Sequence, residues 1–186
     1  MNPTAKSAED YAFLTPVKRT TGKEWLSVLE ASFIIYRLPP HFKNFSKRLV
    51  KSPKLYFVDT GLLCWLLGIR SQEQLSMHAM RGPIFENWVI SEFLKRQFSQ
   101  GEPTNLYFWR DSMQLEIDLI VDNGNEPVPI EIKSGATTSG DQIKPLEKWL
   151  SLSGGKQGFL IYGGENNQKR QHVQIISWRE FPNWVF

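Results

Sequence analysis

The sequence is poor in the residues that mark secreted, membrane-spanning and zinc-binding proteins. Its 186 residues include one cysteine, Cys64, which cannot form an internal disulfide and lies among large apolar residues in LLCWLLG. The histidines His41, His78 and His172 are too scattered along the chain for a zinc site. The longest apolar runs are too short to span a bilayer, and the N-terminus lacks the basic-then-apolar order of a signal peptide. We therefore expect a reduced, cytoplasmic protein without a membrane segment.

Two common catalytic motifs are also missing from the sequence. It contains no GxxxxGKS/T phosphate-binding loop and no GxSxG nucleophile elbow. The single cysteine has no plausible histidine partner for thiol catalysis. ATP hydrolysis by a phosphate-binding loop and covalent catalysis by a serine or cysteine are therefore not expected of these residues.

Acidic residues are absent from one internal stretch, residues 31–58. Basic and aromatic side chains alternate there instead: Arg37, His41, Lys43, Lys47, Arg48, Lys51 and Lys54 with Tyr36, Phe42, Phe45 and Tyr56. This mixture suits contacts with phosphates and stacked bases, so we expect Lys43, Lys47, Arg48 and Lys51 to bind nucleic acid. A solvated hairpin protected by its lysines explains the same pattern equally well. The net charge of +3 is too small to decide between them.

What is present is the composition of an ordinary globular protein, 41% hydrophobic and 22% charged. Residues 1–19 show no clear pattern. Residues 20–68 predict a helix, two strands joined by the basic loop, and a short helix capped by Asp59 or Thr60, which is the order of elements in the tail of a winged-helix domain. We place a domain boundary within residues 69–80.

Residues 80–186 alternate between helical and strand patterns. RGPIFENWVISEFLKRQF predicts an amphipathic helix with Glu86 on its apolar side. The segments LYFWR, QLEIDLIV and PVPIEIK predict three strands, residues 141–152 a second helix, and GFLIYG and VQIISW two more strands. This order predicts an α/β fold in which helices cover a central sheet.

The second and third of these strands carry charged side chains at alternating positions. Strict alternation places Leu115, Ile117, Leu119 and Val121 on one face, and Glu116, Asp118 and Ile120 on the other. If the two strands are hairpin neighbours, Ile130 and Ile132 extend the apolar face. Glu131 and Lys133 then lie beside Asp118, and Glu86 can approach from the covering helix.

Clustered carboxylates repel one another unless a cation lies between them. Mg²⁺ or Mn²⁺ meets this condition, with Asp118, Glu131 and Glu86 as ligands. Lys133 would then orient or deprotonate the attacking water, or stabilise charge that develops on a phosphate. An alternative needs no metal, because Lys133 can neutralise Asp118 and Glu131 in a cross-strand ion-pair ladder. The spacing alone leaves both readings open.

The order of Glu86, Asp118, Glu131 and Lys133 on a helix and two strands resembles the PD-(D/E)xK nuclease-like superfamily. Longer motifs carry a closer resemblance, and they are YRLPP, FSKRLVKSPKLYFVDTGLLCWLLG, RGPIFENWVISEFLK, YFWRD, EIDLIV and PIEIKSG. Together they resemble a domain of unknown function found at the C-terminal end of many bacterial and archaeal AAA+-type ATPases. The similarity extends from about Trp25 to the C-terminus.

The resemblance implies a partial winged-helix segment followed by a restriction-endonuclease-like mixed sheet flanked by helices. It implies that Asp118 and Glu131 are metal ligands, that Lys133 is the catalytic lysine and that Glu86 is the acid on the helix. The expected function is Mg²⁺-dependent hydrolysis of DNA phosphodiesters in a truncated or split relative of an AAA+-type ATPase. The expected partners are DNA and an ATPase domain or another protein. The alternative is a non-catalytic DNA- or protein-binding module with a degenerate nuclease fold.

Overall fold

The computed structural model describes residues 19–41, 52–124 and 126–183. The first part of the chain forms α2 (Arg19–Ala31), β1 (Ile35–Leu38), β2 (Lys54–Phe57), α3 (Thr60–Leu66) and α4 (Gln72–Met77). The second part forms α5 (Arg81–Gln100), β3 (Leu106–Arg110), β4 (Glu116–Val121), β5 (Val128–Lys133), α6 (Gly140–Ser153), β6 (Gly158–Tyr162), β7 (Gln168–Arg170), β8 (Val173–Ser177) and η1 (Phe181–Asn183).

The second part is built around a six-stranded sheet with the strand order β3-β4-β5-β6-β8-β7. Strands β3, β4 and β5 are antiparallel neighbours, whereas β5, β6 and β8 run parallel. The prediction of a mixed sheet flanked by helices is confirmed. The edge strand β7 was not predicted, because its three polar residues QKR show none of the apolar alternation that marks a half-buried strand.

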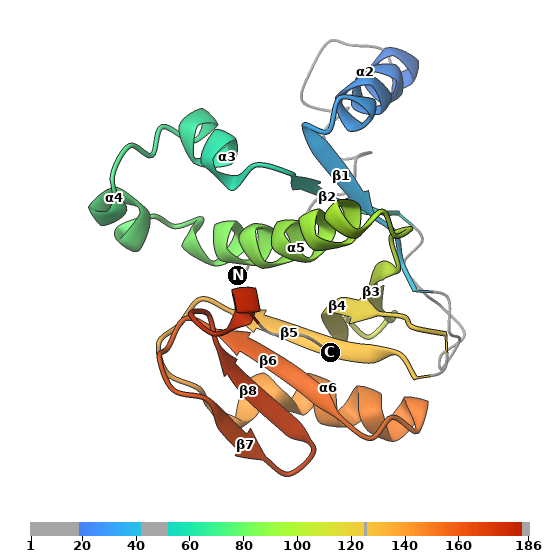
Figure 1. Ribbon diagram of the computed structural model, residues 1–186, viewed down its shortest axis with the longest axis vertical. Helices are drawn as coiled ribbons and strands as arrows, with labels where there is room; N and C mark the ends of the chain where they lie inside the picture. Colours follow the sequence, from blue (N-terminus) through green and yellow to red (C-terminus); the bar gives the residue numbers. More distant parts are fainter. Residues whose placement is uncertain (1–18, 42–51, 125, 184–186) are drawn as a thin grey trace.

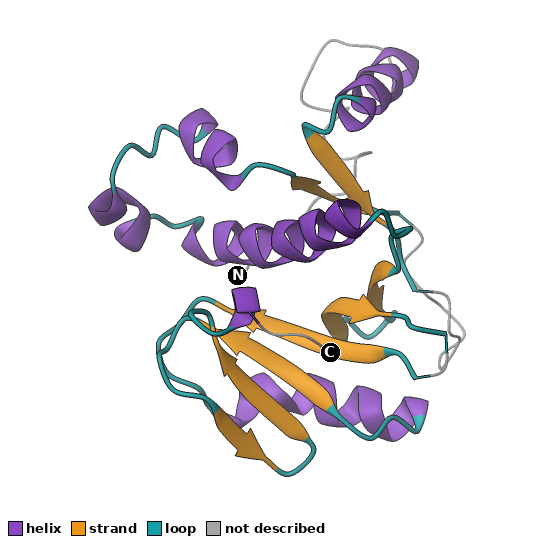
Figure 2. Cartoon of the chain, viewed as in Figure 1, coloured by secondary structure: helices purple, strands orange, loops and turns teal. Residues whose placement is uncertain are grey.

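Helices α5 and α6 lie on opposite sides of this sheet (Figures 1 and 2). Each helix supplies its apolar side to a separate hydrophobic cluster, as the amphipathic patterns predict. The α5 cluster contains Val89, Ile90, Phe93 and Leu94, with Ile130 and Ile132 of β5. The α6 cluster contains Ile143, Leu146, Trp149 and Leu150, with Leu160 of β6 and Ile175 of β8. Within the described residues, no helix has both the length and the apolar character needed to cross a membrane.

Strand β4 departs from the strict alternation that the sequence suggests. Ile117 was expected to share a face with Leu119 and Val121. Instead, Ile117 and Ile120 both belong to the α6 cluster, while Leu119 and Val121 belong to the α5 cluster. The pairing of β3 with β4 shifts register by one residue at this point, which is the signature of a β-bulge. The predicted face was therefore wrong for Leu115 and Ile117, because a bulge next to Asp118 resets the alternation, whereas Ile120 lies opposite Leu119 and Val121 as predicted.

The β1–β2 hairpin docks onto the second part of the chain (Figure 1). Leu38 and Tyr56 are buried in the α5 cluster. The Asn87 side chain on α5 accepts a hydrogen bond from the Phe57 amide at 2.7 Å and donates one to the Phe57 carbonyl at 2.9 Å. Residues from both predicted domains thus share one core. The winged-helix character of residues 20–68 and the boundary after them remain predictions.

Candidate active site

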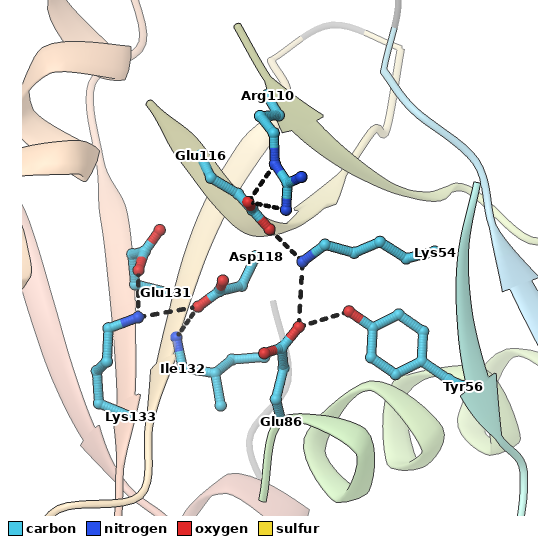
Figure 3. A network of polar contacts seen from close by, with 9 residues as sticks. All are labelled: Lys54, Tyr56, Glu86, Arg110, Glu116, Asp118, Glu131, Ile132 and Lys133. Atoms are coloured by element: carbon cyan, nitrogen blue, oxygen red, sulfur yellow. Dashed lines mark hydrogen bonds and ion pairs between the residues drawn. The ribbon is translucent and has the colours of Figure 1, made fainter. Parts of the chain in front are cut away.

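Charged side chains from β2, α5, β3, β4 and β5 meet at one cavity of about 590 Å³ (Figure 3). All four predicted site residues line this cavity: Glu86, Asp118, Glu131 and Lys133. Lys54, Arg110 and Glu116 line it as well. Asp141 lies at the rim, where its side chain is 82% exposed and paired with Lys144. The sequence therefore identified part of a larger charged network.

Lys133 joins Asp118 of β4 to Glu131 of β5. Its Nζ donates hydrogen bonds to Glu131 Oε2 at 2.8 Å and to Asp118 Oδ2 at 3.3 Å. The backbone amide of Ile132 donates to the same Asp118 oxygen at 2.9 Å, which fixes the carboxylate against β5 (Figure 3). Asp118 and Glu131 are both buried. The cross-strand ion pairs that the sequence allowed are therefore present.

Glu86 lies in the same cavity but has different partners. Its Oε1 accepts hydrogen bonds from the Tyr56 hydroxyl and from Lys54 Nζ, the latter at 3.2 Å. Lys54 also forms an ion pair with Glu116, which in turn pairs with Arg110. Glu86 is thus held toward the β1–β2 hairpin, while Asp118 and Glu131 are held by Lys133 (Figure 3).

The surroundings keep Lys133 charged and Asp118 ionised. Desolvation by burial opposes the charge on Lys133, but Asp118 and Glu131 outweigh it and raise the lysine pKa. Burial likewise acts against the Asp118 carboxylate. Lys133, Lys54 and the Ile132 amide outweigh that effect, so the pKa of Asp118 is lowered.

Glu131 is the acid whose charge is least compensated. Desolvation and then the neighbouring Asp118 raise its pKa well above the usual range, although Lys133 opposes both effects. Its Oε1 is buried and has no hydrogen-bond partner among the described residues. The network formed by Glu86, Glu116, Asp118 and Glu131 with Lys54, Arg110 and Lys133 contains one more acidic group than basic groups. A proton on Glu131 or an added cation would balance it.

The donor set fits a divalent cation held by two carboxylates. Among the residues that the structure describes, no three His, Cys, Asp or Glu side chains are gathered in a way that could hold a metal ion. Mg²⁺ nevertheless needs only one or two carboxylates, because water and substrate phosphates complete its coordination. Asp118 and Glu131 form such a pair, and the unpartnered Glu131 Oε1 is an available oxygen ligand. Binding by all three predicted ligands, including Glu86, remains a prediction.

Sequence reasoning missed the contribution of the β1–β2 hairpin. Lys54 was grouped with the exposed basic stretch, yet only 6% of its side chain is exposed and its charge points into the cavity. Its ion-pair partner Glu86 lies 32 residues further along the chain, so no local pattern connects them. One signal was available in the sequence. Lys54 and Tyr56 are two residues apart in a short strand, so their side chains lie on the same face. The predicted nucleic-acid contacts Lys43, Lys47, Arg48 and Lys51 fall outside the described residues.

Comparison with protein families assigns most of this site to one region. Residues 81–181 match a family described as a domain of unknown function (DUF4143). The chain belongs to this family. The DUF4143 region contains Glu86, Asp118, Glu131 and Lys133. Residues 5–73 match a second family, a domain of unknown function (DUF8612), and that region supplies Lys54. The predicted resemblance to a domain of unknown function is confirmed, while its place among PD-(D/E)xK nucleases remains a prediction.

Two similar curated proteins are an uncharacterized protein of Mycobacterium bovis and one of Mycobacterium tuberculosis. Each is 34% identical to this DUF4143 chain over 133 residues, which is 72% of the chain and 29% of the relative. The chain thus spans less than a third of the length of these relatives. Their names assign no activity.

Proposed function

We propose that this chain is a nuclease-like domain that hydrolyses DNA phosphodiesters with the help of Mg²⁺. The observation that carries the proposal is the meeting of Asp118 and Glu131 at Lys133, inside a cavity that retains one uncompensated acid. Buried carboxylates of this kind are costly for a fold, and metal coordination is one of the few arrangements that favours them.

Asp118 and Glu131 would hold the metal ion. The bound ion would supply Lewis acidity toward a phosphate oxygen and would lower the pKa of a coordinated water. The Ile132 amide supports this role by fixing Asp118, since its hydrogen bond leaves the carboxylate little freedom to rotate. The available oxygen of Glu131 lies on the adjacent strand, so the two ligands come from rigid elements of the sheet rather than from loops.

Lys133 is best suited to stabilise negative charge. Its raised pKa keeps it an ammonium group at neutral pH, so it cannot serve as the general base in this arrangement. A fixed positive charge at a cavity wall stabilises the charge that develops on a phosphate in the transition state. Of the roles that the sequence left open for Lys133, the structure therefore favours charge stabilisation.

A second candidate function is a binding module without catalysis. It is favoured by the completed ion pairs, because Lys133 donates a hydrogen bond to each of Asp118 and Glu131 and so neutralises acids that would otherwise need a metal. In that case the cavity has a structural role and the chain binds DNA, an ATPase domain or another protein. Binding to DNA would then be salt-sensitive and would weaken in Lys47→Ala and Arg48→Ala.

Titration of Mn²⁺ into the purified chain by calorimetry tests the proposal. We expect one bound ion per chain in the wild type and in Asp141→Ala, which removes an exposed acid from the rim as a matched control. We expect no binding in Asp118→Ala. If the wild type binds no Mn²⁺ up to millimolar concentrations, the nuclease proposal is wrong and the binding module is favoured. With binding established, Mn²⁺-dependent nicking of plasmid DNA should be abolished by Lys133→Ala.

A further inference from the structure

Lys54 enters the candidate active site from outside the sheet that carries most of it. Among the described residues that line the cavity, it is the one contributed by the β1–β2 hairpin. Its ammonium lies 3.2 Å from Glu86 Oε1, pairs with Glu116, and sits 5.5 Å from the centre of the Phe108 ring. Its side chain is almost completely removed from solvent. A lysine so deeply placed acts as a fixed positive charge of the site.

The charge of Lys54 acts on the same carboxylates that a metal ion would need. It holds Glu86 directly, and the Tyr56 hydroxyl from the same strand binds the same Glu86 oxygen. Its electrostatic influence also extends to Asp118. A cation and a divalent metal that share acidic neighbours repel each other strongly where water is excluded. A metal ion near Glu86 would therefore compete with Lys54 for the same carboxylate.

We propose that Lys54 is an internal counter-cation that sets the metal affinity of the candidate site, so that hairpin docking and metal binding oppose each other. This inference rests on the proposed function, because it requires a metal at Asp118 and Glu131. With Lys54 in place, Glu86 faces the hairpin and the site has two carboxylates for a metal. With the hairpin withdrawn, Glu86 loses both partners and becomes available as a third ligand.

Coupling of this kind is reciprocal. If the docked hairpin weakens metal binding, then a bound metal must weaken hairpin docking by the same factor. The contacts at stake are those of β2 with α5, namely the Lys54 and Tyr56 contacts to Glu86 and the Asn87 hydrogen bonds to Phe57. The inference therefore makes one prediction about affinity and another about the mobility of β2.

The affinity is tested by Mn²⁺ calorimetry on Lys54→Met, which shortens the side chain by one atom and removes its charge. We expect binding at least about tenfold tighter than in the wild type, and loss of that binding when Asp118→Ala is added. Arg37→Met is the matched control, because Arg37 is a cation of the same hairpin that pairs with Glu30 and does not line the cavity. Its Mn²⁺ affinity should equal that of the wild type.

The outcomes separate this inference from the proposed function. Binding by the wild type that is unchanged or weaker in Lys54→Met overturns the role of Lys54 and leaves the metal site standing. Absence of binding in both proteins overturns both ideas. Binding in Lys54→Met alone, abolished by Asp118→Ala, supports the role of Lys54 but overturns the proposed function, because the wild type would then not hold the metal.

A second measurement on the wild type keeps the inference testable if Lys54→Met does not fold. Deuterium exchange of the β1 and β2 amides is compared with and without saturating Mg²⁺. We expect faster exchange in β2 with metal, and unchanged exchange in β6 and β8 at the far side of the sheet. Slower or unchanged exchange in β2, in protein that binds the metal, overturns the proposed opposition.

Discussion

Replacing Glu131 with glutamine should make the metal-free protein more stable at neutral pH. Only 3% of the Glu131 side chain is exposed, and burial together with Asp118 raises its pKa well above the usual range. The folded protein therefore keeps a proton that the unfolded chain releases above about pH 4.3. The stability that this bound proton contributes is fully present below that pH and is lost as the pH rises toward the pKa of Glu131 in the folded state. Glutamine is neutral at every pH, so the free energy of unfolding of Glu131→Gln does not fall in this way.

The size of the effect follows from the binding of one proton. While the folded state retains the proton and the unfolded state does not, the free energy of unfolding falls by about 1.4 kcal/mol per pH unit. In a domain of 186 residues, about 1 kcal/mol corresponds to roughly 2–4 °C in melting temperature. The gap in melting temperature between the variant and the wild type should therefore widen by about 3–6 °C for each pH unit in this window.

The assay is thermal unfolding followed by circular dichroism between pH 4 and pH 8, in buffer with a chelator. Glu126→Gln is the matched control, because this glutamate is 46% exposed and lies outside the cavity. Its profile should run parallel to that of the wild type. If Glu131→Gln also runs parallel, or is less stable at every pH, then Glu131 is not a protonated buried acid and the reasoning fails. Added Mg²⁺ should restore stability to the wild type but not to Glu131→Gln.

Three further substitutions test how the hairpin and the sheet are held, each by urea unfolding at neutral pH. Asn87→Ala should cost about 2–3 kcal/mol, because it removes the side chain that bonds both backbone groups of Phe57; a smaller cost than 1 kcal/mol would argue against this anchor. Gly163→Ala should cost about 3 kcal/mol or more, since an added Cβ would lie 2.3 Å from the Ser134 carbonyl oxygen. Gly22 lies inside α2, where an added Cβ meets open space, so Gly22→Ala should stabilise the protein by about 0.5–1 kcal/mol. Similar effects at Gly163 and Gly22 would contradict this account of their packing.

The order of helices and strands was readable from the sequence because it depends on local periodicity. The stripe of α5 and the strand patterns of β3 to β6 and β8 each contain enough apolar residues to define their period. Glu86 was correctly placed near the sheet for the same reason, as an acid on the apolar side of its helix. Asp118, Glu131 and Lys133 were brought together by hairpin geometry alone, and the structure agrees.

Features that depend on distant contacts were not readable. The bulge in β4 comes from how β3 pairs with it, and neither strand shows it in its own sequence. The burial of Lys54 depends on Glu86 and Glu116, which lie on two other elements. The sequence does not distinguish an exposed lysine from a buried, paired one, because the neighbouring residues of the strand do not show which distant acids the lysine contacts. The partners of Glu86 therefore had to come from the structure.

The docked β1–β2 hairpin also bears on how such chains can be cut and recombined. Residues that match one family supply Lys54, whereas residues that match another supply its acceptor Glu86. Exchanging the first segment for that of a relative would replace the residue at position 54, which lines the cavity, together with the rest of the hairpin. In a fragment starting at residue 80, Glu86 would lack the lysine that neutralises it. The part of the core that the hairpin covers would be exposed to solvent. A chain that keeps only one of the two segments therefore separates Lys54 from Glu86.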